Sequence, residues 1–311
     1  MAALADVILP VFVVLGAGYF AAWRGWFSAA GADGLMDFTQ KFAIPCLLFR
    51  AISDIDLDAE FDLGLLDSFY IGVAFAFVMG ALGARFLFGR SPEDAVAIGF
   101  TAFFSNSVLL GLPIMERAYG TAALAPNYTL VAFHAPLLYA VGIVTMELVK
   151  NRGRAMGAAF VWDVLRSIFS NALVIGILLG FAVNLEQLTV PAPIDAATSM
   201  LARAALPAAL FGLGALLYRY RPEGDMRVIG WVALTSLVVH PAITFGLATQ
   251  VFALSTGQVR AAVVTAAMAP GVNSYVFANL FGTAKRVAAS SVLICTGLSL
   301  VSAWGWLSLL P

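Results

Sequence analysis

The chain has 311 residues, of which 61% are hydrophobic and 11% are charged, and its formal net charge is −1. A soluble domain has about 45–50% apolar and about 25% charged residues, so this chain cannot cover its surface with polar groups and lipid must be its solvent. The balanced charge, without a basic block, excludes a nucleic-acid-binding protein.

Ten apolar segments follow one another along the chain, each long enough for a helix to cross about 30 Å of hydrocarbon. Barrel strands would alternate apolar and polar residues, and these segments do not. The predicted segments are 6–23, 35–53, 63–88, 93–118, 121–149, 160–184, 197–218, 226–253, 258–281 and 285–308. The sequence therefore predicts an all-α polytopic membrane protein with ten transmembrane helices.

Lysine and arginine predict the orientation, because cytoplasmic loops carry an excess of both residues. Of the 17 basic residues, 13 lie at one set of segment ends and four at the other set. The four are Arg50, Arg117, Arg203 and Arg260. The larger set is then cytoplasmic, and both termini and the acidic stretch 54–62 face outward.

The second half of the chain repeats the first, with matches in the same order along both halves. At an offset of 162, residues 42–49 match 204–211, with four of eight positions identical, and Gly18 matches Gly180. At an offset of 167, Asn106-Ser107 matches Asn273-Ser274. Each repeat contains five segments, an odd number, so the two repeats enter the membrane in opposite senses. Inverted repeats are typical of secondary transporters.

Segments four and nine each contain helix-breaking residues near the middle, at corresponding places in the two repeats. The expected helix-break residues are Gly111, Pro113 and Pro270. A broken helix exposes N-terminal N–H groups with partial positive charge, which can hold a carboxylate. Ordinary kinks are the alternative, since Gly, Pro, Ser and Asn are common in membrane helices, but the matched positions favour a midplane site.

Residues 106–113, Asn-Ser-Val-Leu-Leu-Gly-Leu-Pro, resemble the Asn…Leu-Gly-Leu-Pro segment of the auxin efflux carrier family. Residues 269–282, which begin Ala-Pro-Gly-Val-Asn-Ser-Tyr, resemble its second crossover helix. The chain looks most similar to bacterial malonate-transporter-like members. The resemblance implies a secondary transporter of the bacterial inner membrane that carries a small organic anion by elevator-type alternating access. That anion would be a malonate-, malate- or auxin-like mono- or dicarboxylate. The charge split then predicts periplasmic termini.

The resemblance also implies a homodimer in which each chain has a scaffold and a mobile core. Residues 1–60 and 160–222 would form the scaffold, and residues 61–150 and 225–311 the core, where the two broken helices cross. Asn106 and Asn273 match the crossover asparagines that contact a substrate carboxylate. The other expected substrate-binding residues are Ser105, Ser107, Gly271, Ser274 and Tyr275. No cofactor, metal site or enzymatic activity is expected.

His134 and His240 lie near the centres of segments five and eight. They are candidates for proton coupling, because His titrates near neutral pH. The alternative is a neutral imidazole bonded to a helix carbonyl.

Three other functions are alternatives to this transporter. An intramembrane enzyme would need a catalytic set, such as a His-Glu-x-x-His zinc site, that this sequence lacks. A membrane sensor would not need two polar breaks. A sodium-coupled carrier of bile-acid-symporter type shares the general architecture, and sodium-dependent uptake would identify it.

The charge distribution generates a topology prediction. A cysteine introduced at position 56 should react with an impermeant reagent in intact cells, and one at position 152 should react only after permeabilisation. The reverse labelling pattern would overturn the orientation.

Overall fold

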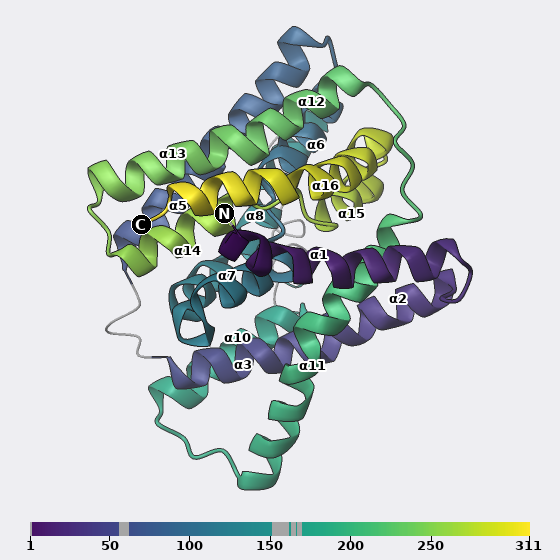
Figure 1. Ribbon diagram of the computed structural model, residues 1–311. Helices are drawn as coiled ribbons and strands as arrows, with labels where there is room; N and C mark the ends of the chain where they lie inside the picture. Colours follow the sequence, from purple (N-terminus) through teal and green to yellow (C-terminus); the bar gives the residue numbers. More distant parts are fainter. Residues whose placement is uncertain (1, 56–61, 151–161, 163–165, 167–169) are drawn as a thin grey trace. The chain divides into compact units, whose positions relative to one another are not determined.

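A computed structural model of the chain describes residues 2–55, 62–150, 162, 166 and 170–311 (Figure 1). Every regular element in these residues is helical, apart from one antiparallel bridge between Ser105 and Pro270. The all-helical class is therefore confirmed. Two stretches named above lie outside the described residues. Positions 56–61 belong to the acidic stretch and include labelling position 56, and positions 151–161 include labelling position 152 and the start of segment 160–184.

The helices follow the predicted segments closely. Their bounds are α1 (Ala2–Trp23), α2 (Ala29–Phe38), α3 (Ile44–Asp54), α5 (Leu63–Leu82), α6 (Pro92–Phe103), α7 (Leu112–Tyr119), α8 (Ala125–Lys150), α10 (Ala172–Leu185), α11 (Ala192–Leu217), α12 (Met226–Leu234), α13 (His240–Gly246), α14 (Thr256–Ala266), α15 (Asn273–Phe281) and α16 (Lys285–Leu309). Turns of π-helix extend or join them at Thr39–Ala43, Gly83–Leu87, Ser107–Gly111, Thr235–Val239 and Leu247–Val251.

Six helical stretches among the described residues are long and apolar enough to cross a membrane. They are Asp6–Trp23, Leu63–Leu87, Thr121–Lys150, Ala192–Leu217, Met226–Val251 and Lys285–Leu309, and α10 is a shorter apolar helix. Segments 93–118 and 258–281 are each divided into two helices too short to cross alone. Segment 35–53 is also not among the six stretches, so the count of ten transmembrane helices stays a prediction.

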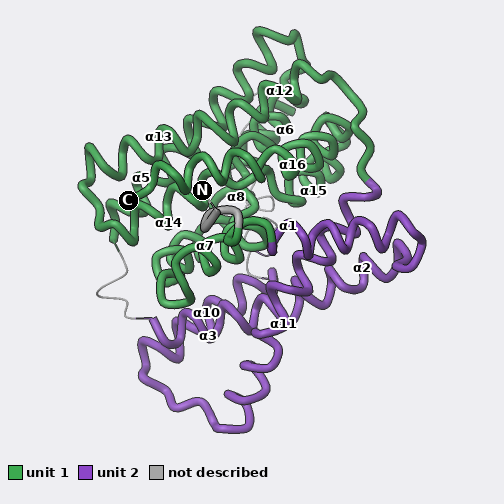
Figure 2. Tube along the Cα trace, viewed as in Figure 1, with its two compact units in different colours: residues 1–9, 62–156, 220–311 green, residues 10–61, 157–219 purple. Residues whose placement is uncertain are grey.

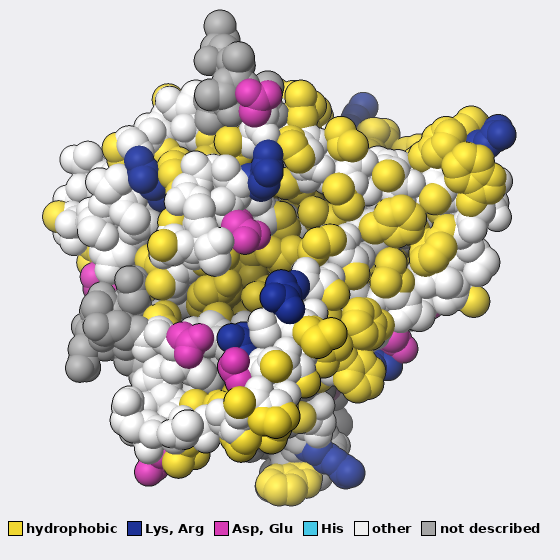
Figure 3. Space-filling model, turned by 60° about the horizontal axis from the view of Figure 1, so that its bottom comes forward, with side chains coloured by type: hydrophobic (Ala, Val, Ile, Leu, Met, Phe, Trp, Pro, Cys, Tyr) yellow, Lys and Arg dark blue, Asp and Glu magenta, His cyan; other side chains and the backbone are white. Residues whose placement is uncertain are grey.

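Large apolar side chains cover much of the face shown in Figure 3, where charged side chains are sparse. Phe75 and Val78 on α5, and Val301 on α16, are more than half exposed. Water would disfavour a surface of this kind, whereas lipid tails do not.

The chain folds into two compact units, each assembled from separate parts of the sequence (Figure 2). Unit 1 contains residues 1–9, 62–156 and 220–311, and unit 2 contains residues 10–61 and 157–219.

Close backbone contacts at glycines hold unit 2 together. A Cβ on Gly18 would lie 2.0 Å from the Phe211 carbonyl oxygen, and a Cβ on Gly180 would lie 2.8 Å from the Phe49 carbonyl oxygen. Small residues of this kind let helix backbones approach closely in a membrane. The offset of 162 relates Gly18 to Gly180 and also Phe49 to Phe211, so equivalent residues make both contacts.

The core of unit 1 is aromatic and lies between α5, α6, α8, α14 and α15. Phe69, Phe100, Phe103 and Phe277 are all essentially inaccessible to solvent. A rigid core of this kind can hold a polar site in fixed geometry, because close-packed side chains have few alternative rotamers.

The glycine contacts generate a stability prediction. Gly18→Ala places its new methyl group inside the contact distance of Phe211 and should destabilise the protein by about 1–3 kcal/mol, the usual cost of overpacking. Gly16→Ala is the matched control on the same helix, because its Cβ would have no atom within 4 Å. Thermal unfolding in detergent measures both. Equal Tm values for the two variants would contradict the close contact.

Candidate functional site

The first interruption follows α6. The chain leaves the helix at Phe104, and a π-helical turn then leads into α7. Asn106 begins this turn, and its Oδ1 accepts a hydrogen bond from the Leu109 N–H at 3.3 Å, as an N-capping Asn does. Pro113 lies in the first turn of α7, where its missing N–H is not needed. The interruption therefore precedes both Gly111 and Pro113, and Asn106 marks its end.

The second interruption lies between α14 and α15 and contains Pro270 and Gly271. Helix α15 begins directly afterwards at Asn273, whose side chain is half-buried. The next residue, Ser274, is fully buried. Three of the expected substrate-binding residues thus lie at or beside this interruption.

The two interruptions bond to each other inside unit 1. The Asn106 N–H donates to the Ala269 carbonyl at 2.8 Å, and the Gly271 N–H donates to the Phe104 carbonyl at 2.8 Å. These bonds flank the antiparallel bridge described above. Each interruption therefore satisfies backbone groups that the other leaves without a helical partner, as the interior of a membrane protein requires.

This bonding pattern is symmetric, but not at the offset that the two asparagines share. An offset of 165 relates the two N–H donors, Asn106 and Gly271, and also the two carbonyl acceptors, Phe104 and Ala269. Asn106 is therefore equivalent to Gly271 at the bridge, and Asn273 lies two residues further along. The two asparagines align in sequence at 167 but take different places: one caps a π-helical turn and the other begins an α-helix.

The expectation of unpaired backbone N–H groups at the half-helix ends is wrong for several of these groups. Carbonyls of Asn106, Gly271 and Val272 already accept the N–H groups of Leu110, Gly111, Ser274, Tyr275 and Val276. The short turns at both ends use these donors internally. Side chains, rather than these amides, must supply the donors of the site.

Three side chains at the interruptions keep polar atoms that are buried and have no hydrogen-bond partner among the described residues. They are Ser105 Oγ, Asn106 Nδ2 and Ser274 Oγ. The residues are 3%, 5% and 0% exposed. A buried donor without a partner costs about 1–3 kcal/mol, so a water or ligand is expected to satisfy it. The three donors define the candidate site.

The remaining expected contacts lie beside these donors. Ser107 is buried, and its N–H donates to the Ser105 carbonyl at 2.8 Å. Tyr275 is half-buried, and its ring packs against that of Tyr220 with 5.1 Å between centroids.

Both histidines are buried, and one of them bonds to the site. The His134 Nε2 lies 3.1 Å from the Ser105 carbonyl, while its Nδ1 finds no partner in the described part of the chain. The His134 ring packs on Phe104 at 5.0 Å and on Phe69 at 5.7 Å. His240 packs on Phe69 at 5.4 Å. The structure thus brings His134 to the interruption and places His240 beside the shared Phe69 ring.

A stacked aromatic pair joins the two interrupted helices. The rings of Phe100 on α6 and Phe277 on α15 lie 3.9 Å apart and nearly parallel. Gly142 on α8 makes room for them, since a Cβ there would lie 2.4 Å from Phe100 Cδ2. The stack therefore fixes α6, which leads into the first interruption, against α15, which follows the second.

The sequence analysis missed one buried polar contact close to the site. Asn127 Nδ2 on α8 donates to Thr265 Oγ1 at 2.9 Å and to the Ala261 carbonyl at 3.3 Å, next to the end of α14. An Asn inside an apolar segment was the only available signal.

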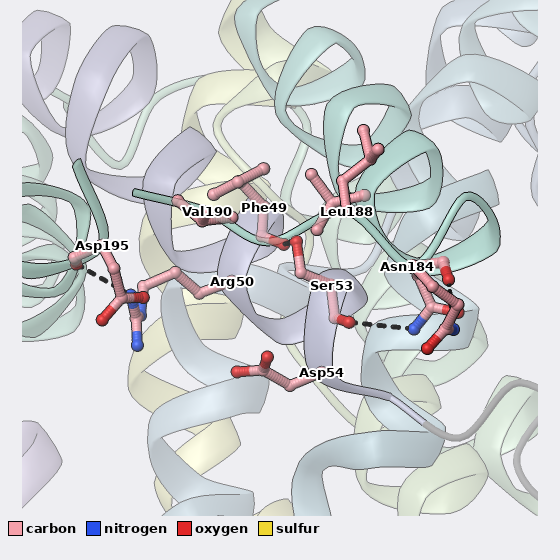
Figure 4. Close-up of a pocket in the computed structure, with 10 residues that line it drawn as sticks. Phe49, Arg50, Ser53, Asp54, Asn184, Leu188, Val190 and Asp195 are labelled. Atoms are coloured by element: carbon pink, nitrogen blue, oxygen red, sulfur yellow. Dashed lines mark hydrogen bonds and ion pairs between the residues drawn. The ribbon is translucent and has the colours of Figure 1, made fainter. Parts of the chain in front are cut away.

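A cavity of about 280 Å³ lies in unit 2, and none of the residues predicted for the site lines it (Figure 4). Arg50 pairs with the Asp195 carboxylate among its lining residues. Asn184 Nδ2 donates to carbonyls at the end of α3 and just beyond it, including Ser53 at 3.0 Å. Its charged groups are paired or exposed, whereas the donors at the interruptions are buried and unpaired. The interruptions are therefore the stronger candidate.

The fully buried polar side chains of the described residues include no Asp, Glu, Lys or Arg. These residues also contain no group of three or more His, Cys, Asp or Glu side chains placed to hold a metal. Spanning helices, an apolar surface and neutral buried donors at two bonded interruptions define a multi-pass membrane protein with a polar interior site.

The chain belongs to the membrane transport protein family, whose model matches residues 4–307. The resemblance inferred from residues 106–113 and 269–282 is thereby confirmed, since a plant auxin efflux carrier is among the relatives.

Three relatives are similar over different shares of their length. A protein of Rhizobium meliloti named "Putative malonate transporter" is 25% identical over 100% of this chain and 97% of its own. The mouse lysosomal cholesterol signaling protein is 26% identical over 67% of this chain, and auxin efflux carrier component 6 of Arabidopsis thaliana is 24% identical over 48%. The matches cover 25% of each of these two larger proteins.

The aromatic stack generates a prediction for the site's framework. Phe277→Ala removes a fully buried ring and should destabilise the protein by about 3–5 kcal/mol. Val276→Ala, the adjacent half-exposed position on α15, should have little effect. Thermal unfolding of both variants in detergent is the measurement, and a small effect at 277 would show that the stack does not hold the interrupted helices.

Proposed function

We propose that this protein is a secondary transporter that moves a small organic anion across the plasma membrane of a bacterium. The observation that carries the proposal is the pair of interrupted helices that bond to each other and leave three buried donors unpaired. Family membership and the full-length similarity to the Rhizobium meliloti protein support a transporter of carboxylates.

A carboxylate fits the donors that remain at the interruptions. An ionised carboxylate is purely an acceptor, with room for about four hydrogen bonds. Asn106 Nδ2 and the hydroxyls of Ser105 and Ser274 are donors without partners. Asn273 at the start of α15 adds a further amide, and the helix dipole favours negative charge there. Neutral donors suit a transporter, because the anion must also leave.

Two inverted repeats of five segments explain the paired contacts in both units. In unit 2, Gly18 meets Phe211 as Gly180 meets Phe49, and in unit 1 the two backbone bonds exchange under a shift of 165. Contacts that recur between equivalent residues are what an internal two-fold relation produces. With ten membrane crossings, the interrupted helices then cross at the membrane midplane.

Alternating access of elevator type assigns different roles to the two units. Unit 1 contains the complete set of interruptions, buried donors and histidines, so it carries the substrate as the mobile core. Unit 2 is the scaffold, through which two chains form a homodimer. The charge distribution predicts that both termini face the periplasm.

None of the three reported relatives is named as a bile-acid symporter, so that alternative gains no support from them.

Asn106→Ala and Asn273→Ala should weaken malonate binding about 10- to 150-fold. The physical reason is the loss of a hydrogen bond to a charged group, worth about 1.5–3 kcal/mol. Isothermal titration calorimetry on purified protein measures the affinity. Asn279→Ala, an exposed position on the same helix as Asn273, is the matched control and should bind like wild type.

Asn106→Asp separates binding from folding. An Asp keeps an oxygen for the Leu109 N–H but replaces the free amide donor with a negative charge. It should fold and run as the same homodimer in native mass spectrometry, yet lose malonate binding. Wild-type affinity in both Asn106→Asp and Asn273→Ala would show that the site lies elsewhere.

A further inference from the structure

The bond to Ser105 fixes which nitrogen of His134 carries a proton. A carbonyl oxygen can only accept, so the Nε2 that lies 3.1 Å from it must be the N–H donor. A neutral His134 is then protonated at Nε2, and its Nδ1 presents a lone pair. That Nδ1 is buried and has no partner among the described residues. His134 therefore has one nitrogen that anchors the interruption and one that is free to take a proton.

The site has a charge problem that a second proton on His134 would solve. The described residues place no cationic side chain among their fully buried groups, and hydrogen bonds from neutral donors leave the full charge of a bound anion uncompensated. A buried charge is costly unless an opposite charge accompanies it. A doubly protonated imidazole donates from both nitrogens and makes a stronger, charge-assisted bond to a carboxylate.

His240 is less suited to this role. Its ring packs on Phe69, as that of His134 does, and its Nε2 has no partner in the described structure. No hydrogen bond joins it to either interruption among the described contacts. His134, in contrast, is bonded to the residue that precedes Asn106.

We infer that His134 is the proton-binding residue of this transporter, and that the organic anion and one proton, held at His134 Nδ1, bind and leave together. This inference rests on the proposed function and adds the coupling ion. On binding, a proton from water joins the Nδ1 lone pair, and the new N–H donates to the substrate carboxylate. On release, the N–H bond breaks and the proton returns to water. No other bond changes, and each cycle moves one proton with one anion.

Few other ionisable groups surround His134, which lies near the middle of α8. The helices packed against α8 are α5, α6 and α14. Their charged residues, and those of α8 itself, lie within about two turns of a helix end: Asp67, Glu93, Asp94, Glu147, Lys150 and Arg260. The nearer titratable groups are His240, Tyr70, which donates to the Leu130 carbonyl, and the α8 residues Tyr128 and Tyr139. A tyrosine stays neutral at physiological pH, so no carboxylate competes for the proton at midhelix.

The inference gives a definite pH dependence. Between pH 7 and 8, carboxylates are ionised and an ordinary imidazole is mostly neutral. Binding then takes up one proton, so malonate affinity should rise about tenfold for each unit by which the pH falls.

Calorimetry can count this proton directly. Malonate is titrated into wild-type protein, purified without a histidine tag, at pH 7.5 in buffers with different ionisation enthalpies. About one proton should be taken up per malonate. His134→Gln keeps an amide donor for Ser105 but cannot be protonated, and it should bind more weakly with no proton uptake. His240→Gln is the matched control and should take up one proton, as the wild type does.

A second measurement does not depend on how the variant at 134 folds. The chain has two histidines, so His134 is the only histidine left in His240→Gln. With ¹⁵N-labelled histidine, the spectrum of this variant should change from imidazole to imidazolium when malonate is added. An imidazole spectrum in the bound state would overturn the inference.

The outcomes separate this inference from the proposed function. Malonate binding without proton uptake, or proton uptake that survives in His134→Gln, would overturn the role of His134 and leave the carboxylate site intact. Failure of the wild type to bind malonate, succinate or an aromatic acetate would overturn the proposed substrate class, and the inference with it.

Discussion

Lipid offers no hydrogen bonds, and this constraint governs the part of the protein where the helices stop. Two helices end and restart inside an apolar chain, at Phe104–Asn106 and at Ala267–Val272. Their backbone groups would be unpaired if either interruption stood alone. Instead, each supplies a carbonyl and an N–H to the other. With the main chain satisfied in this way, the unmet hydrogen bonding is concentrated on the side chains of Ser105, Asn106 and Ser274.

The surroundings of these side chains are built for rigidity. The rings of Phe100 and Phe277 stack between α6 and α15, and Gly142 provides the space that the two rings need. His134 ties α8 to the first interruption through the Ser105 carbonyl. If these polar groups bind the proposed anion, their geometry would change little, so less of the binding free energy would be lost to ordering.

Much of this architecture could be predicted from the sequence, because segment length and apolar content identify helices in lipid directly. The helix ends lie close to the predicted ends, and Asn106, Ser105 and Ser274 were recognised as polar residues in apolar segments. The exact breaks could not be located. Pro113 suggested one but fits inside the first turn of α7, whereas the break depends on bonds to residues more than 160 positions away. The equivalence of Asn106 to Gly271, rather than to Asn273, could not be predicted for the same reason, because it follows from these long-range bonds.

The bonds between the interruptions have a consequence for how the protein is made. When residues 104–106 leave the ribosome and enter the bilayer, the partners of the Phe104 carbonyl and the Asn106 N–H do not yet exist. Those partners, Gly271 and Ala269, follow only after most of the remaining chain has been synthesised. Water, a chaperone or the insertion machinery must satisfy the first interruption during that interval. The N-terminal half alone would therefore be a poor substrate for stable membrane insertion, and the site is completed only near the end of synthesis.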